Sequence, residues 1–243
     1  SGISSYDVMD QLLEYILTAT TTSTKNTSIK KKKKRFPAVT RIVVMGHSAG
    51  GQYVQRWSLL SNSSIIWDQN QNDDDRKVDI RVVPANPRSY AYLDNRRMIR
   101  QQQPKHEPQQ PKREQQQQSS QLRRNNDSEN NEDIGTVKNY EYVFAVPHPQ
   151  DIASCPSYNQ WEWGFDEDAV EVGMTSPYRD RALETSTATD MAHRYGTQRQ
   201  VQYLVGGNDT IDLNSDGCEQ YNHNFQGYTR NERGHHYYQA LTH

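Results

Sequence analysis

The chain has 243 residues, a formal net charge of −2 and an apolar content of only 33%. This balance gives no overall electrostatic case for binding nucleic acid or an anionic membrane. No run of about 18 apolar residues is present, so no membrane-spanning helix is predicted. The length suits one α/β domain. Because the sequence starts without methionine, we expect residues 1–243 to be a single domain that is a fragment of a longer protein.

The first half of the chain predicts a helix, a loop, a strand and a second helix. Residues 4–19 predict a helix that Ser4 or Ser5 caps, with Val8, Leu12, Tyr15 and Ile16 on its apolar face. Residues 20–34 form a Lys/Thr-rich tract, which we interpret as a solvated loop insertion rather than a nucleic-acid signal. Residues 41–45 are continuously apolar and β-branched, which indicates a buried parallel strand. A helix over residues 52–61 follows.

The second half predicts two further strands separated by a long excursion. Residues 78–83 and 200–205 predict strands. The excursion over residues 87–195 contains a Gln-rich tract, 100–133, which we expect to be disordered, then an extended aromatic segment near 140–147 and a helix within 178–195. Helical stretches are expected within 219–241. Strands alternating with helices predict an α/β fold with a parallel sheet.

A Gly-His-Ser-Ala-Gly motif at residues 46–50 connects the first predicted strand to the second predicted helix. A serine hydroxyl is a weak nucleophile, so it needs a base and dipoles that stabilise the oxyanion. The G-x-S-x-G turn supplies part of this, because it exposes the serine at the start of a helix. We expect both glycines to be required because a β-carbon would clash there. The motif predicts Ser48 as nucleophile and the Ala49 N–H as an oxyanion donor.

The order of a triad on this type of sheet is serine, acid, histidine. Asp209 follows the third predicted strand and is our candidate acid, with Asp212 as the second choice. His47 adjoins Ser48 and would point away from it. The later histidines are His223, His235, His236 and His243; we interpret His235 and His236 as surface residues and expect the catalytic base to lie beyond residue 243.

Cysteine use leaves two alternatives open. Cys155 and Cys218 are the two cysteines of the chain. One disulfide and two buried free thiols are equally compatible with their spacing.

Several segments together resemble a poorly characterised group of α/β-hydrolases from bacteria, fungi and other microbial eukaryotes. The matching segments include residues 4–10, 35–37, 46–56, 85–94, 155–164, 203–210 and 218–234. The resemblance implies a partial three-layer α/β-hydrolase fold with Ser48 as nucleophile and Asp209 as acid. It also implies that Cys155 and Cys218 pair, which would place the protein in a secreted, endomembrane or extracellular setting. The Lys-rich and Gln-rich tracts depart from the pattern.

Two functions are consistent with these features. The first is a serine hydrolase that acts on a carboxyl ester or related acyl substrate, small or polymeric, with no cofactor or metal. The second is a catalytically inactive binding or scaffold protein with an α/β-hydrolase fold. In the first case the 87–195 excursion would form a lid, and Asn86, Tyr90 and Trp161 are candidates for lining the substrate pocket. Ordinary packing explains the aromatic residues equally well.

Overall fold

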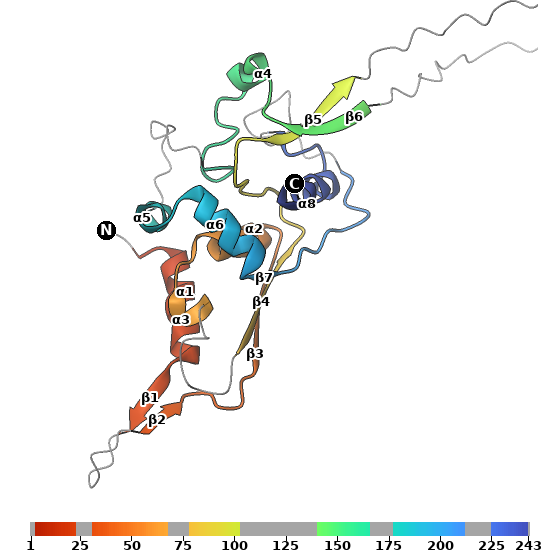
Figure 1. Cartoon of the computed structure of the whole chain (residues 1–243). Coiled ribbons are helices and arrows are strands. Elements are labelled where there is room, and N and C mark those ends of the chain that lie inside the picture. The colour runs from red at the N-terminus through yellow and green to blue at the C-terminus, as the bar shows by residue number, and fades with distance from the viewer. Residues whose placement is uncertain are drawn as a thin grey trace, which may run out of the picture.

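The computed structural model describes residues 3–22, 31–67, 78–102, 140–165, 177–211 and 225–242. Within them the chain is a mixed α/β structure built on a small parallel sheet with helices (Figure 1). The helices are α1 (Ser5–Leu17), α2 (Ala49–Leu60), α3 (Ser64–Trp67), α4 (Pro149–Ser154), α5 (Pro177–Thr185), α6 (Ala188–Thr197) and α8 (Arg230–Thr242). The strands are β1 (Ala19–Thr22), β2 (Lys31–Lys34), β3 (Arg41–His47), β4 (Asp79–Ala85), β5 (Arg97–Gln102), β6 (Tyr140–Ala145) and β7 (Gln200–Val201).

The parallel sheet has the strand order β3-β4-β7. Its register pairs Val44 with Val82, and Val82 in turn with Val201. The three strands are those predicted from the sequence, although β7 is shorter than expected and continues only as an isolated bridge between Ala85 and Leu204. Because all three strands run in the same direction, their carboxyl ends meet at one edge of the sheet.

Strand β3 is buried on one face only, so the prediction of a fully buried strand was wrong. Val44 points into the core, whereas Val43 and Met45 are 52% and 59% exposed. A first core cluster joins α1, α2 and α3 to β3 and β4, and its helices lie on one side of these strands (Figure 1). Its buried members are Leu13, Val44, Val54, Trp57, Ile66, Val78, Ile80 and Val82. Within the described ranges, no element covers the face that carries Val43 and Met45.

Helix α1 begins where the sequence predicted, but its apolar stripe faces the other way. The Ser4 side chain and Asp7 form a capping box, which satisfies two free donors of the first turn. Leu13 is 3% exposed and packs against the sheet. Leu12 is 52% exposed, and the predicted apolar face, to which it belongs, is turned largely to solvent.

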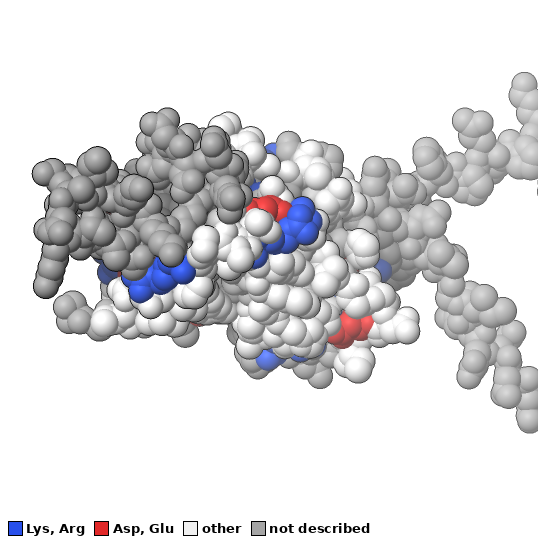
Figure 2. Space-filling view, turned by 90° about the horizontal axis from the view of Figure 1, so that it is seen from below, with Lys and Arg blue, Asp and Glu red and all other residues white. Residues whose placement is uncertain are grey.

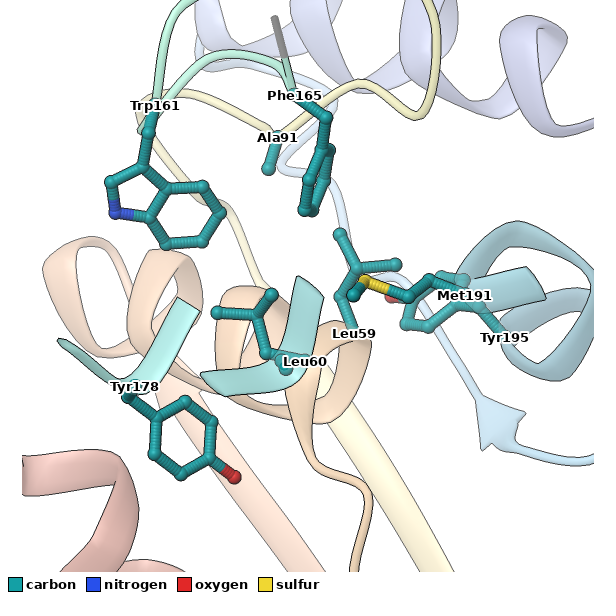
Figure 3. Close-up of a cluster of buried hydrophobic side chains, with 9 residues drawn as sticks. Leu59, Leu60, Ala91, Trp161, Phe165, Tyr178, Met191 and Tyr195 are labelled. Carbon is teal, nitrogen blue, oxygen red and sulfur yellow. The ribbon is translucent and has the colours of Figure 1, made fainter. Parts of the chain in front are cut away.

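A second core cluster lies between α2, α5 and α6, which contribute Leu59, Tyr178 and Met191 among others (Figure 3). The sequence predicted one helix in this region, and the structure has two. The break comes at Thr187, which caps α6 in a capping box with Asp190. A local cap satisfies free N–H groups of a new helix, which favours the start of α6 at this point.

Two antiparallel hairpins extend from this framework. Strands β1 and β2 pair at the two ends of the Lys/Thr-rich tract, so the ends of the predicted loop are in fact strands; residues 23–30 lie outside the described residues. Strands β5 and β6 pair in the same way, and most of the predicted disordered tract lies outside the description, between them.

The described surface carries small groups of charged side chains. On the face shown in Figure 2, a few basic and acidic side chains lie among uncharged ones, and one acidic group adjoins a basic one. One ion pair joins Arg181 of α5 to Asp7 of α1. None of the described helices is long and apolar enough to cross a membrane.

Candidate functional site

Ser48 occupies the sharp turn between β3 and α2 and has an unusual backbone conformation. Its φ is 55° and its ψ is −115°, a region that costs a non-glycine residue about 1–3 kcal/mol. The Ser48 N–H donates to the Ala85 carbonyl at 3.0 Å, so the turn is bonded to the end of the neighbouring strand. The predicted strand-to-helix placement of this serine is confirmed.

The glycines around Ser48 differ in what they tolerate. A β-carbon at Gly46 would lie 2.1 Å from the Gly50 carbonyl oxygen, and one at Gly51 would lie 2.7 Å from the Ala85 oxygen. A β-carbon at Gly50 would meet no described atom within 4 Å. The expected clash therefore exists at Gly46, the expectation for Gly50 was wrong, and Gly51 is a further close contact that the sequence did not predict.

The first helical turn after Ser48 presents unpaired backbone donors. Helix α2 begins at Ala49, and its first backbone bond runs from Gln52 N to Ser48 O at 3.0 Å. The N–H groups before Gln52 have no carbonyl partner inside the helix and lie at the positive end of its dipole. The Ala49 N–H thus lies next to the Ser48 side chain, where an oxyanion donor is needed.

Asp209 lies at the same edge of the sheet, in a turn after β7. Its N–H donates to Gly206 O at 3.1 Å. Its Oδ2 accepts a hydrogen bond of 2.5 Å from Asn86 Nδ2 and pairs with Arg230 at 3.4 Å. The candidate acid is therefore held by side chains from the end of β4 and from α8.

The strand order places the two candidate catalytic residues at the same edge of the sheet. Ser48 follows β3 and Asp209 follows β7, with β4 between them. Neighbouring strands are about 4.8 Å apart, so β3 and β7 are separated by about 10 Å. Among the described residues, no hydrogen bond joins Ser48 to Asp209.

Two described histidines lie near the site in the sequence or the fold: His47 directly precedes Ser48, and His236 lies in α8, the helix that also carries Arg230. The His236 ring in α8 is buried, and its Nδ1 is 3.0 Å from Gln226 O. Burial lowers the pKa of His236, while nearby Glu232 opposes that shift. The prediction that His236 is a surface residue was wrong, whereas His235 is exposed. Among the described residues, no histidine hydrogen-bonds to Ser48 or Asp209; His223, His243 and the alternative acid Asp212 lie outside them.

No family model, curated protein or solved structure matches this chain. Within the described parts of the chain, no group of three or more potential metal ligands occurs.

The residues predicted to line a pocket occupy different environments. Asn86 is at the site, but its side chain bonds to Asp209 and Gly206. Tyr90 is buried against Tyr237 with the rings stacked 4.6 Å apart. Trp161 packs in the second core cluster with Phe165 (Figure 3). Core packing accounts for the burial of both aromatic residues, and their role in substrate binding stays a prediction.

Two further features lie apart from Ser48. Cys155 is buried against Tyr158 and Phe225; Cys218 is outside the described residues, so their disulfide stays a prediction. An open cavity of about 410 Å³ lies between the β5–β6 hairpin and α8, and neither Ser48 nor Asp209 is among its lining residues.

Sequence reasoning missed the contacts that hold the acid. Arg230 was not considered, and Asn86 was treated as a substrate contact. The position of Asn86 shortly after the predicted strand 78–83 was an available signal, since parallel strands place their carboxyl ends side by side. Nothing in the local sequence indicates that Arg230, 21 residues after Asp209, returns to it.

Proposed function

We propose that this chain is the catalytic part of a serine hydrolase of the α/β-hydrolase type. The observation that carries the proposal is the conformation of Ser48, held with φ at 55° between a parallel strand and the start of a helix. Such strain persists only where surrounding contacts impose it, and it is concentrated at functional sites. Here Gly46, Gly51 and the bond to Ala85 impose it.

The proposed chemistry is acyl transfer through a covalent intermediate. The Ser48 oxygen attacks the carbonyl carbon of an ester, and a histidine oriented by Asp209 takes the hydroxyl proton. The Ala49 N–H stabilises the resulting oxyanion. The histidine returns the proton to the leaving alcohol as the ester bond breaks, and water then hydrolyses the acyl-serine by the same steps.

The substrate class in this proposal is a carboxyl ester or a related acyl compound. A backbone N–H at the start of a helix is suited to the oxygen of a tetrahedral acyl intermediate. The fold that best accommodates these elements is an α/β-hydrolase in which the described sheet is one part.

A second candidate is an inactive protein that keeps this fold for binding. The observation that favours it is that no histidine among the described residues hydrogen-bonds to Ser48 or to Asp209. A serine without a base is a poor nucleophile, so such a protein would keep the turn at Ser48 without catalysing acyl transfer.

A fluorophosphonate probe distinguishes the two, because it labels only an activated serine. We expect the full-length natural protein to be labelled and Ser48→Ala to be unlabelled, and a panel of short to long acyl esters would then define chain-length preference. Ser58→Ala is the matched control, since Ser58 is buried in α2 with its hydroxyl bonded to Gln55 O. A folded, unlabelled wild-type protein would support the inactive binding protein.

A further inference from the structure

Asn86 connects the segment that carries the nucleophile to the segment that carries the acid. It directly follows Ala85, whose carbonyl accepts the Ser48 N–H. On the other side, its N–H donates to Leu204 O at 2.7 Å. Its side-chain oxygen accepts from Gly206 N at 3.2 Å, and its side-chain nitrogen donates to Asp209. One residue therefore fixes the turn and the carboxylate of the acid.

The two oxygens of Asp209 are used unequally. Oδ2 accepts from Asn86 and pairs with Arg230. Among the described residues no donor bonds to Oδ1. A carboxylate fixed through one oxygen leaves the other oriented to accept the N–H of a base, as the acid of a triad does.

We propose that Asn86 is a positioning residue that orients the Asp209 carboxylate toward the catalytic base. This inference rests on the proposed hydrolase function. Asn86 does not contact the reacting atoms; it acts through Asp209, and Arg230 supplies a second, charged contact to the same oxygen.

The residue type at position 86 matches both demands of the site. Its φ is 46°, in the left-handed region, which asparagine tolerates better than other residues with a β-carbon. Its amide offers a donor and an acceptor on one short side chain, and both are used. Aspartate would keep the shape and the acceptor but lose the donor.

Two substitutions at position 86 change the side-chain hydrogen bonds and keep the left-handed backbone conformation. Asn86→Gly removes both side-chain bonds and keeps the left-handed conformation without steric cost. Asn86→Asp keeps the size but places a second carboxylate against Asp209. Asn231→Ala is the matched control, because Asn231 Nδ2 donates to Gly206 O at 3.2 Å in the same turn without touching the Asp209 side chain.

The readout is the rate of fluorophosphonate labelling of the full-length protein as a function of pH, with p-nitrophenyl acetate hydrolysis for kcat and KM. We expect Asn86→Gly to lower kcat about 10- to 100-fold at nearly unchanged KM, the effect of one lost charge-assisted hydrogen bond. Asn231→Ala should stay near wild type. Circular dichroism confirms that each variant is folded.

The pH profile of Asn86→Asp gives a signature that a purely structural role would not produce. Among the described residues, the Asp209 carboxylate bonds to the side chain at position 86, and Arg230 pairs with the same carboxylate oxygen. At neutral pH the two carboxylates repel each other, so labelling is slow. As the pH falls, one proton is shared, and the protonated carboxyl donates to Asp209 as the amide did. The ratio of variant to wild-type rate should therefore rise toward acidic pH.

The outcomes separate this inference from the function on which it rests. If Ser48→Ala is still labelled or active, the hydrolase proposal fails. If Ser48→Ala is inert but Asn86→Gly has a wild-type rate, or Asn86→Asp shows no relative recovery at acidic pH, the positioning role of Asn86 is refuted alone. An equal loss in Asn231→Ala would also refute it, because stability of the turn would then explain the effect.

Discussion

Gly46 and Gly50 flank Ser48 symmetrically in the sequence, yet their environments differ. The α-carbon of Gly46 faces the backbone of α2, so even a methyl group has no room there. Gly50 is exposed in the first turn of the helix. Of these two flanking glycines, only Gly46 allows a close approach of backbone segments at the Ser48 turn. Gly50 serves no such packing role among the described residues.

This difference predicts opposite effects of the same substitution. Gly46→Ala should destabilise the protein by about 1–3 kcal/mol or more, because the clash is with backbone atoms that cannot rotate away. Gly50→Ala should stabilise it by about 0.5–1 kcal/mol, because alanine loses less conformational freedom in a helix. Urea denaturation followed by circular dichroism measures both. A loss of stability in Gly50→Ala equal to that in Gly46→Ala would contradict the described turn.

The sequence predicted much of the site at this scale, because the motif itself specifies local geometry. The turn at Ser48 and the place of Asp209 after a strand both follow from short-range patterns. The bonds of Asp209 to Asn86 and Arg230 do not, since they join residues 123 and 21 positions away. Such contacts depend on the tertiary arrangement of strand ends, which residue patterns do not encode.

At the scale of elements, α1 shows why the presence of a helix is easier to predict than the face that it buries. The helix carries apolar side chains on two faces, and both follow the helical period. The face with Leu13 packs against β3, α2 and α3. The stripe of Val8, Leu12 and Tyr15 satisfies the same spacing but remains exposed. Periodicity identifies a helix, and only the neighbouring elements determine which face is buried.

Two adjacent leucines test this orientation. Leu13→Ala should lower the free energy of unfolding by about 2–5 kcal/mol, because it leaves a cavity in the first core cluster. Leu12→Ala should change it by no more than about 0.5 kcal/mol, as expected for an exposed position. Urea denaturation of both variants gives the comparison. A larger loss at Leu12 than at Leu13 would mean that the stripe predicted from the sequence is the buried one.

At the scale of the whole molecule, one hydrogen-bonded cluster links α2 to α8. The Gln55 side chain donates to Tyr237 OH at 2.9 Å and exchanges bonds with the Ala91 backbone. Tyr237 in turn contacts three other tyrosine rings. This cluster joins residues 182 positions apart, which places it beyond any local sequence signal. It also fixes α8, and with it Arg230, relative to the sheet.

The hydrogen bond between Gln55 and Tyr237 predicts that two neighbouring tyrosines differ in how much their hydroxyl groups stabilise the fold. Tyr237→Phe should lower the free energy of unfolding by about 1–3 kcal/mol, because it removes a buried hydroxyl that bonds to Gln55 and Tyr203, while Gln55 keeps its backbone partner. Tyr238→Phe should stay within about 0.5 kcal/mol of wild type, because Tyr238 is exposed. Chemical denaturation monitored by tyrosine fluorescence and circular dichroism reports both values. Equal effects would show that the Gln55 bond does not stabilise the position of α8.

The half-exposed strand β3 has a consequence for the behaviour of this polypeptide in solution. Within the described residues it pairs with β4 on one side only, so its other edge carries unsatisfied backbone donors and acceptors beside Val43 and Met45. An apolar strand with an open edge is a template for pairing with further chains. Handled alone, the polypeptide is therefore expected to aggregate through β3, and a charged residue at position 43 would be the most direct means of keeping it monodisperse.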